Sequence, residues 1–177
     1  MLSFNNLSLR RGSNLLFEYV RFTVNKINKV GLVGANGTGK TSLFKMILGE
    51  FESDQGQCKY PPDLKVACMA QEIPGTDEKA LDYVISGDEK SVEIQKAISD
   101  AESNEKYDSL GELHSQLEDL DGFTAKSRAE KLLVGLGFSE EEFSKTLKDF
   151  SGGWRVRLNL AKTLMQPSDL LLLDEPT

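Results

Sequence analysis

A glycine-rich loop between an apolar run and a helix-forming run constrains this chain more than any other feature. The loop is Gly34-Ala35-Asn36-Gly37-Thr38-Gly39-Lys40-Thr41, with Ser42 behind it. Two glycines followed by Lys and a hydroxyl residue at this spacing match the phosphate-binding loop pattern. The run before it, Val30 to Val33, predicts a buried strand, and Ser42 to Leu48 predicts a helix. The loop therefore has the strand and the helix that its pattern requires.

The chemistry of this loop suits a nucleoside triphosphate. Its glycines let the backbone turn tightly, so that successive N–H groups point into one concavity that accepts phosphate oxygens. The N-terminus of the following helix adds partial positive charge. Lys40 would reach the β- and γ-phosphates, and the Thr41 hydroxyl would hold Mg²⁺. A plain glycine-rich turn is the alternative, but such a match arises by accident in under ~1% of chains this long.

Bulk composition limits the remaining options. The 177 residues have room for one domain with a subdomain, and 39% hydrophobic with 28% charged residues is typical of a soluble globular protein. A net charge of −7 argues against a surface made for nucleic acid. Cys58 and Cys68 lack metal-site spacing, which favours reduced thiols in a cytoplasmic protein. The sequence has neither a signal peptide pattern nor a bilayer-length apolar run, so membrane work would need another subunit.

Strands are expected on both sides of the loop. Leu7 and Leu9 alternate with polar residues, as do the apolar residues from Val20 to Val24. This alternation predicts half-buried antiparallel strands. Two more short strands are predicted, at Cys58 to Tyr60 and at Lys65 to Ala70. The second of these ends at Gln71.

From Ala80 onward the pattern predicts helices. Apolar residues from Ile94 to Ala101 share one helix face, and leucines from Leu110 to Leu120 form a narrower stripe. Together they predict a helical hairpin at about 90–121. Between Asp88 and Asp121 eleven acidic residues oppose three lysines, which makes contact with RNA phosphates electrostatically unfavourable. A solvated helical face is the favoured interpretation of this charge.

Later segments predict three further helices and a closing strand. Ala125 to Leu136 forms the first helix, Ser139 to Glu142 has the shape of a capping box, and Arg155 to Met165 is helical by composition. Leu170 to Leu173 predicts a buried strand, and the carboxylates of Asp174 and Glu175 follow it directly.

Two groups of residues near the end of the chain suggest catalysis. A carboxylate at the end of a parallel strand lies beside a phosphate loop, so Asp174 would bind Mg²⁺ directly or through water. Glu175 would then polarise the attacking water as a general base. Ser151-Gly152-Gly153 begins a predicted helix and is a second candidate anion site. By itself, however, an ordinary N-cap explains that segment better.

Together, these residues resemble the ATP-binding cassette family along essentially the whole chain. Four motifs stand in the family's order: Gly34–Thr41, Gln71, Ser151–Gly153 and Leu170–Glu175. The wording from Phe150 to Ala161 and from Asp174 to Thr177 looks like the ABC-F branch. The resemblance implies an α/β P-loop NTPase fold with a parallel core sheet, an N-terminal antiparallel β layer and a helical subdomain.

The expected layout is a partial nucleotide-binding domain over 1–177. It has a β layer and phosphate-loop core at 1–72, a helical subdomain at 73–150, and the signature helix with the Walker B strand at 151–177. The fold would be incomplete after that strand, because the family's D-loop, switch histidine, linker and second cassette are missing. The single histidine, His114, lies beside the leucine stripe and is expected on a helix surface.

Residue roles follow from the resemblance. Gln71 would couple the γ-phosphate and Mg²⁺ to the helical subdomain, and would join Thr41 and Asp174 around the metal. Ser151, Gly152 and Gly153 would contact the γ-phosphate of ATP held by the opposite cassette. Family members place an aromatic residue against adenine near the start of the chain, and the matching position is Arg11. A planar guanidinium can also lie against a base.

The implied function is ATP binding and, in the full-length protein, ATP hydrolysis that drives a soluble ABC-F protein, with the ribosome as partner and a role in translation. The other partner would be the second cassette of the same chain, or a self-dimer. The isolated 177 residues are expected to bind nucleotide weakly and to turn over negligibly.

Other functions fit some of the same motifs. A membrane transporter subunit shares every catalytic motif, but the 80 residues from Gln71 to Ser151 favour the ABC-F branch. A non-hydrolysing regulatory module is the second alternative, against which Asp174 and Glu175 argue. A coiled-coil DNA-repair ATPase is disfavoured, because its insertion would far exceed the 111 residues from Lys40 to Ser151.

Overall fold

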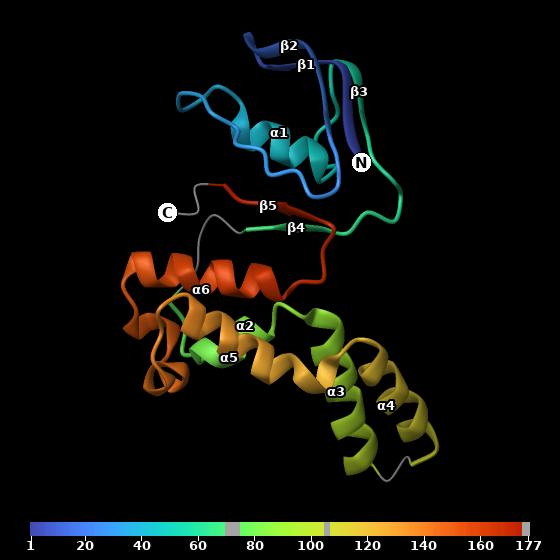
Figure 1. The fold of residues 1–177 in the computed structure, drawn as a ribbon, viewed down its shortest axis with the longest axis vertical. Coiled ribbons are helices and arrows are strands. Elements are labelled where there is room, and N and C mark those ends of the chain that lie inside the picture. Colours follow the sequence, from blue (N-terminus) through green and yellow to red (C-terminus); the bar gives the residue numbers. More distant parts are fainter. Residues whose placement is uncertain (70–74, 105–106, 175–177) are drawn as a thin grey trace. The chain divides into compact units, whose positions relative to one another are not determined.

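The computed structural model describes residues 1–69, 75–104 and 107–174, which fall into two compact units. The first unit comprises Met1–Val66 and Ser168–Leu172, and the second comprises Ala67–Pro167 and Leu173–Thr177. Figure 1 shows the elements of each unit along the chain. Within the described ranges, no helix has the length and apolar character that crossing a membrane requires.

The first unit is built on a three-stranded antiparallel sheet in the order β2-β1-β3. Its strands are β1 (Leu2–Arg11), β2 (Asn14–Val24) and β3 (Gln55–Lys59). The central strand β1 pairs with β2 along its whole length, from Leu2 opposite Val24 to Arg11 opposite Asn14. The apolar side chains of β1, such as Phe4 and Leu7, are fully buried. The expected antiparallel β layer is confirmed.

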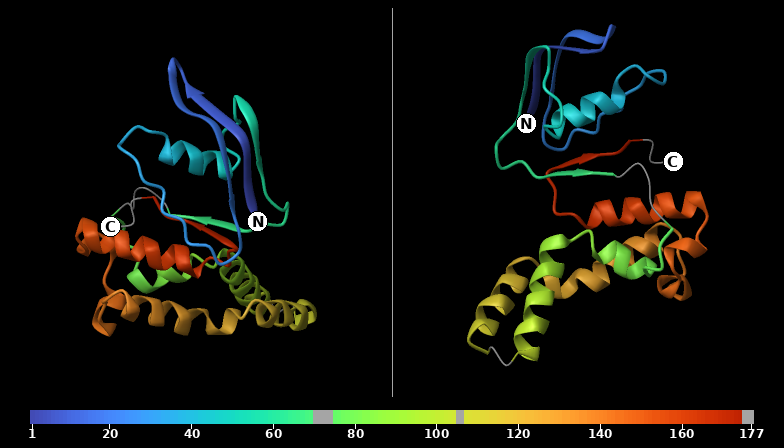
Figure 2. Two further views of the ribbon diagram at one scale, coloured as in Figure 1. Left: turned by 45° about the horizontal axis from the view of Figure 1, so that its top comes forward. Right: turned by 180° about the vertical axis from the view of Figure 1, so that it is seen from behind.

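Helix α1 (Lys40–Ile47) follows the glycine-rich loop, as expected, and lies beside this sheet (Figure 2). Its buried residues Leu43, Met46 and Ile47 form the apolar stripe that packs into the first unit. The helix ends at Ile47, and the N–H of Gly49 beyond it donates to the Met46 carbonyl at 3.1 Å. The neighbouring Glu50 N–H donates to the Lys45 carbonyl at 2.8 Å, so the last turn of the helix is closed.

Two short strands, β4 (Val66–Cys68) and β5 (Leu170–Leu172), form a parallel pair (Figure 1). The pair is anchored at Lys65, whose N–H donates to Asp169 Oδ2 at 3.1 Å. The Lys65 carbonyl accepts the Leu170 N–H, also at 3.1 Å. Residues 104 and 105 positions apart in the chain are thereby aligned at the start of both strands.

The prediction of a strand from Val30 to Val33 is wrong. These residues form no strand, and Val30 and Val33 are 62% and 95% exposed. An apolar run acquires strand structure only when a neighbouring strand accepts its N–H and C=O groups. The described sheets pair other segments and leave this run without a ladder.

The second unit is organised around three packed helices, α2 (Ala80–Ile85), α5 (Ala125–Gly135) and α6 (Gly152–Met165). One apolar core joins them, with Val84, Leu133 and Leu158 fully buried at its centre. A hairpin of α3 (Glu89–Ser103) and α4 (Leu110–Asp119) extends from this core (Figure 1), with the 3₁₀ turn η1 (Tyr107–Ser109) leading into α4. The expected helical hairpin is confirmed.

Short 3₁₀ turns connect these helices. They are η2 (Gly122–Thr124), η3 (Glu140–Ser144) and η4 (Leu147–Asp149). The capping box expected at Ser139 is present, although the helix that it opens is 3₁₀. A second capping box at Thr146 opens η4, the last turn before α6.

Candidate nucleotide site

The phosphate loop lies in the first unit and is held by its own lysine. Lys40 is the first residue of α1, and its Nζ donates to the carbonyl oxygens of Gly34 at 2.8 Å and of Ala35 at 3.0 Å. The ammonium group therefore reaches back over the loop. In this position it is surrounded by the backbone on which the pattern places phosphate groups.

Close packing inside the loop explains two of its glycines. The Thr38 hydroxyl donates to the Ala35 carbonyl at 2.8 Å, and a Cβ added to Gly34 would lie 2.8 Å from this hydroxyl oxygen. Gly39 has a φ of 98°, and a Cβ there would lie 3.1 Å from Cβ of Leu16 in β2. The loop thus has room for glycine alone at Gly34 and Gly39. Leu16 supports the site, and sequence reasoning did not find it.

The electrostatics of the loop favour an anion. Gly39 is the N-cap of α1 and has no side chain that could occupy the helix's first N–H groups. The first turn, which contains Thr41 and Ser42, has no acidic residue. The helix dipole and the Lys40 ammonium therefore add without a local carboxylate to offset them. The tight glycine cradle, the ammonium and the Thr41 hydroxyl together fit a phosphate group with Mg²⁺.

The signature residues lie in the second unit, at the N-terminus of α6. Ser151 is the N-cap in extended conformation, and its carbonyl accepts the Arg155 N–H at 2.9 Å. Gly152 and Gly153 form the exposed first turn, which also lacks an acidic residue. The 14-residue helix α6 therefore presents an uncompensated positive end at the predicted second anion site.

The predicted metal and catalytic residues are only partly described. Asp174 follows β5, is half-buried, and is assigned to the second unit, whereas Thr41 belongs to the first. Gln71 and Glu175 lie outside the described residues. Within those that are described, no group of three or more His, Cys, Asp and Glu side chains could hold a metal ion. The expected Mg²⁺ ligands are of another kind, since Thr41 and Gln71 are among them.

Arg11, the predicted adenine contact, is the last residue of β1 and is exposed. Its guanidinium carbon lies 3.6 Å from the ring centroid of Phe51, and Lys45 Nζ lies 5.6 Å from the same centroid. Phe51 carries no motif, so sequence reasoning did not find it. His114 lies on the exposed side of α4, as expected, and stacks on Phe123 with centroids 6.2 Å apart.

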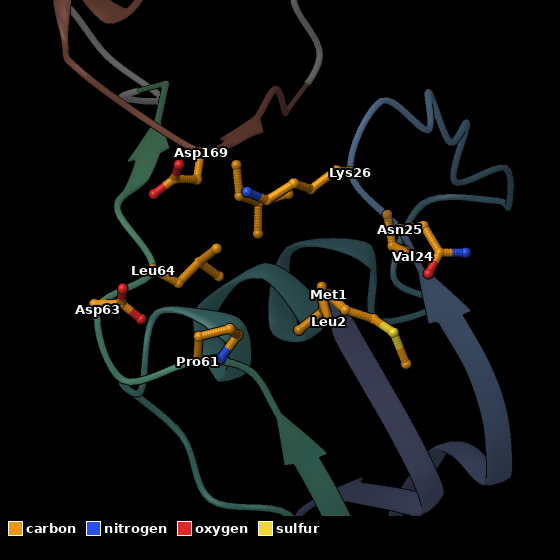
Figure 3. Close-up of a pocket in the computed structure, with 10 residues that line it drawn as sticks. Met1, Leu2, Val24, Asn25, Lys26, Pro61, Asp63, Leu64 and Asp169 are labelled. Atoms are coloured by element: carbon orange, nitrogen blue, oxygen red, sulfur yellow. The ribbon is translucent and has the colours of Figure 1, made fainter.

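A pocket elsewhere in the first unit is too small for a nucleotide. It encloses about 130 Å³ between Met1, Val24, Leu64 and Asp169 (Figure 3), and no predicted site residue lines it. Small-molecule sites usually enclose about 300–1,000 Å³. The candidate site is the glycine-rich loop, on the contacts of Lys40 and of the loop glycines.

Comparisons with known proteins agree with a nucleotide-binding site in this chain. The family model described as "ABC transporter" covers residues 17–177. The chain is 49% identical over its whole length to the "Probable ATP-binding protein YheS" of Haemophilus influenzae, and spans 28% of that relative's length. It is 37% identical, over 84% of its length, to the human "ATP-binding cassette sub-family F member 3", of which it covers 21%.

A solved structure bears on the fold. A nucleotide-free ATP-binding cassette from an ABC transporter superimposes with a TM-score of 0.64 at 21% identity. The match covers all of this chain and 69% of that one, and confirms the expected α/β cassette fold. The chain belongs to the ABC transporter family, as an ATP-binding cassette domain whose curated relatives include ABC-F proteins.

Proposed function

We propose that the phosphate loop binds the triphosphate of ATP with Mg²⁺, and that the full-length protein hydrolyses ATP to drive its conformational cycle. The observation that carries this proposal is the position of the Lys40 ammonium, 2.8 Å from the Gly34 carbonyl above an uncompensated helix N-terminus. A cation held there by weak neutral acceptors gains free energy when phosphate oxygens replace them.

The residues of the chain have distinct proposed roles. Lys40 exchanges the Gly34 and Ala35 carbonyls for the β- and γ-phosphate oxygens, while the loop N–H groups hold the same phosphates. The Thr41 hydroxyl, with Asp174 and Gln71, would hold the metal, and Mg²⁺ would supply charge neutralisation to the phosphates. Glu175 accepts a proton from the attacking water as general base.

The signature residues are proposed to complete a second cassette's site. Ser151, Gly152 and Gly153 point N–H groups and a helix dipole at an anion from an exposed end of α6. We propose that this anion is the γ-phosphate of ATP held by a second cassette of the full-length chain, or by a second copy of this one. Alone, the 177 residues would then bind ATP weakly and turn over negligibly, because one cassette cannot close the site.

The cellular role proposed is that of a cytoplasmic ABC-F protein acting on the ribosome in translation. Its support is the identity to sub-family F proteins and the hairpin insert before the signature helix. A transporter subunit is the alternative, since it carries the same loop. Sedimentation of the full-length protein with ribosomes in the presence of ATP tests the role, and recovery with membranes instead would favour the transporter subunit.

Calorimetry on the full-length protein tests the nucleotide site. Lys40→Ala should weaken binding of ATP with Mg²⁺ by about 10- to 100-fold, as loss of a charge-assisted contact predicts. Lys59→Ala, an exposed lysine on β3 of the same unit, is the matched control and should leave binding unchanged. Equal affinity in Lys40→Ala and the parent protein would refute the proposed site. Glu175→Gln should retain ATP binding and slow hydrolysis by about 10²- to 10⁴-fold if Glu175 is the base.

A further inference from the structure

Arg11 and Phe51 form a close cation–π contact. The guanidinium carbon is 3.6 Å from the ring centroid, which is the separation of stacked planar groups. The ring is half-buried, and Arg11 is exposed. The guanidinium carbon therefore lies over the ring, and Arg11 keeps exposed surface.

Two hydrogen bonds fix the chain segments that carry this pair. The Asp54 N–H donates to the Ser8 carbonyl at 3.0 Å, and the Asp54 carboxylate accepts the Arg10 N–H. Asp54 thus holds the segment behind Phe51 against the end of β1, next to Arg11. The closed end of α1 precedes Phe51 on its other side. The stack is consequently preorganised before any ligand arrives.

The pair belongs to the same unit as the phosphate loop and shares its positive charge. Lys45 lies 5.6 Å from the Phe51 centroid. It follows Lys40 by five residues, or about 7.5 Å along the axis of α1. A nucleotide whose phosphates lie at Lys40 has its sugar and base beyond them. Arg11 is linked to the loop through β2, because it pairs with Asn14, and Leu16, two residues further along β2, packs against Gly39 of the loop.

We propose that Phe51 is a positioning residue that holds the Arg11 guanidinium flat, so that the base of the bound nucleotide stacks on its exposed face. This inference rests on the proposed nucleotide site and adds the residue that orients the base platform. Arginine supports such stacking because its guanidinium is planar and weakly hydrated. An arginine without this contact would lose rotamer entropy when it bound the base. The contact with Phe51 restricts the side chain before binding, so that less entropy is lost in the binding step.

The test compares a ligand that has a base with one that lacks it. Calorimetry on the full-length protein with Mg²⁺ measures affinity for ATP and for inorganic tripolyphosphate. Phe51→Leu and Arg11→Lys should each weaken ATP binding by about 5- to 30-fold and leave tripolyphosphate binding within about twofold. Arg11→Lys retains the positive charge and removes the planar guanidinium. Because Arg11 is exposed, this variant should keep the fold even if Phe51→Leu does not.

Two controls separate positioning from a purely structural effect. Phe51→Tyr preserves the ring and should restore parental ATP affinity. Arg10→Ala removes the neighbouring exposed arginine of β1 and should change neither ligand. Unchanged ATP affinity in Arg11→Lys, or an equal loss of both ligands in Phe51→Leu, overturns the inference. Lys40→Ala should weaken both ligands, so a failed phosphate site is told apart from a failed base platform.

Discussion

The Asp88 carboxylate accepts a hydrogen bond from the Arg128 guanidinium at 2.6 Å, which ties the start of α3 to α5. The Asp88 side chain is 2% exposed and also accepts the Ser91 N–H at 3.4 Å, as the N-cap of α3. One carboxylate therefore both caps the first helix of the hairpin and joins the hairpin to the three-helix core.

Removing this carboxylate should destabilise the second unit. Asp88→Ala leaves a partly buried guanidinium without its partner and α3 without its cap, so we expect a loss of about 2–4 kcal/mol in the free energy of unfolding. Lys126→Ala, which breaks the exposed Lys126–Glu130 pair at 3.9 Å, should cost no more than about 0.5 kcal/mol. Urea unfolding followed by circular dichroism measures both. Similar midpoints for the two variants would contradict the assigned role of Asp88.

Gly87, which follows α2, lies directly against the backbone of α6. A Cβ at Gly87 would lie 2.1 Å from the Lys162 carbonyl oxygen, so the backbones must separate in Gly87→Ala. We expect a loss of about 2–4 kcal/mol in unfolding free energy. Gly111→Ala is the matched control, because no atom lies within 4 Å of a Cβ there. In helix α4 it should gain up to about 1 kcal/mol. In chemical denaturation, Gly87→Ala should lower the free energy of unfolding and Gly111→Ala should raise it. An unchanged free energy of unfolding in Gly87→Ala would refute the close packing.

The aromatic cluster behind the signature residues gives an optical test. Phe138 is 3% exposed, and its ring centroid lies 4.7 Å from that of Trp154, the single tryptophan of the chain. Phe138→Ala should cost about 3–5 kcal/mol and shift Trp154 fluorescence to the red as water reaches the indole. The control is Phe123→Ala, whose ring is 61% exposed and whose removal should leave the emission unchanged. Identical spectra for all three proteins would disprove this packing.

Acid should weaken the two capping boxes before α6. The Ser139 backbone N–H and the Lys145 ammonium hold the pKa of Glu142 below its usual value. The Thr146 hydroxyl and its backbone N–H lower the pKa of Asp149 in the same way. Folding lowers the pKa of both carboxyl groups, so the two charged carboxylates stabilise the folded state at pH values above the unfolded-state pKa. This stabilisation is lost as the pH falls through the folded-state pKa.

The measurable consequence is a drop in stability between about pH 5 and pH 3. A double variant with Glu142→Gln and Asp149→Asn should lose less stability over this interval than the parent protein. Thermal unfolding at several pH values, with NMR titration of the two carboxyl groups, checks the direction. A raised pKa for either group would be the contrary outcome.

Local patterns predicted the elements whose stability is mostly local. The glycine-rich loop predicted that a helix follows it, alternation predicted β1 and β2, and leucine spacing predicted the hairpin. The capping box at Ser139 also formed. Each of these depends on residues only a few positions apart, for which periodicity and backbone geometry are sufficient. The resemblance carried by the ordered motifs predicted the cassette family, which the family model confirms.

Contacts between distant residues required the tertiary structure. Asp88 and Arg128 are 40 residues apart, as are Arg11 and Phe51, and neither pair carries a motif. The strand predicted from Val30 to Val33 does not form, for a related reason. Its apolar residues are local, but a strand also depends on a partner edge supplied by another segment.

The sequence by itself determined that this chain carries a phosphate loop at a helix N-terminus, because glycine spacing and one lysine are sufficient to specify that local geometry. The tertiary structure alone decided which side chains surround it. Leu16 against Gly39 and Phe51 beneath Arg11 are brought together by sheet pairing and by the closed end of α1. The physical reason is that local backbone preferences act over one turn or one strand, whereas packing selects partners by shape and charge across the whole unit.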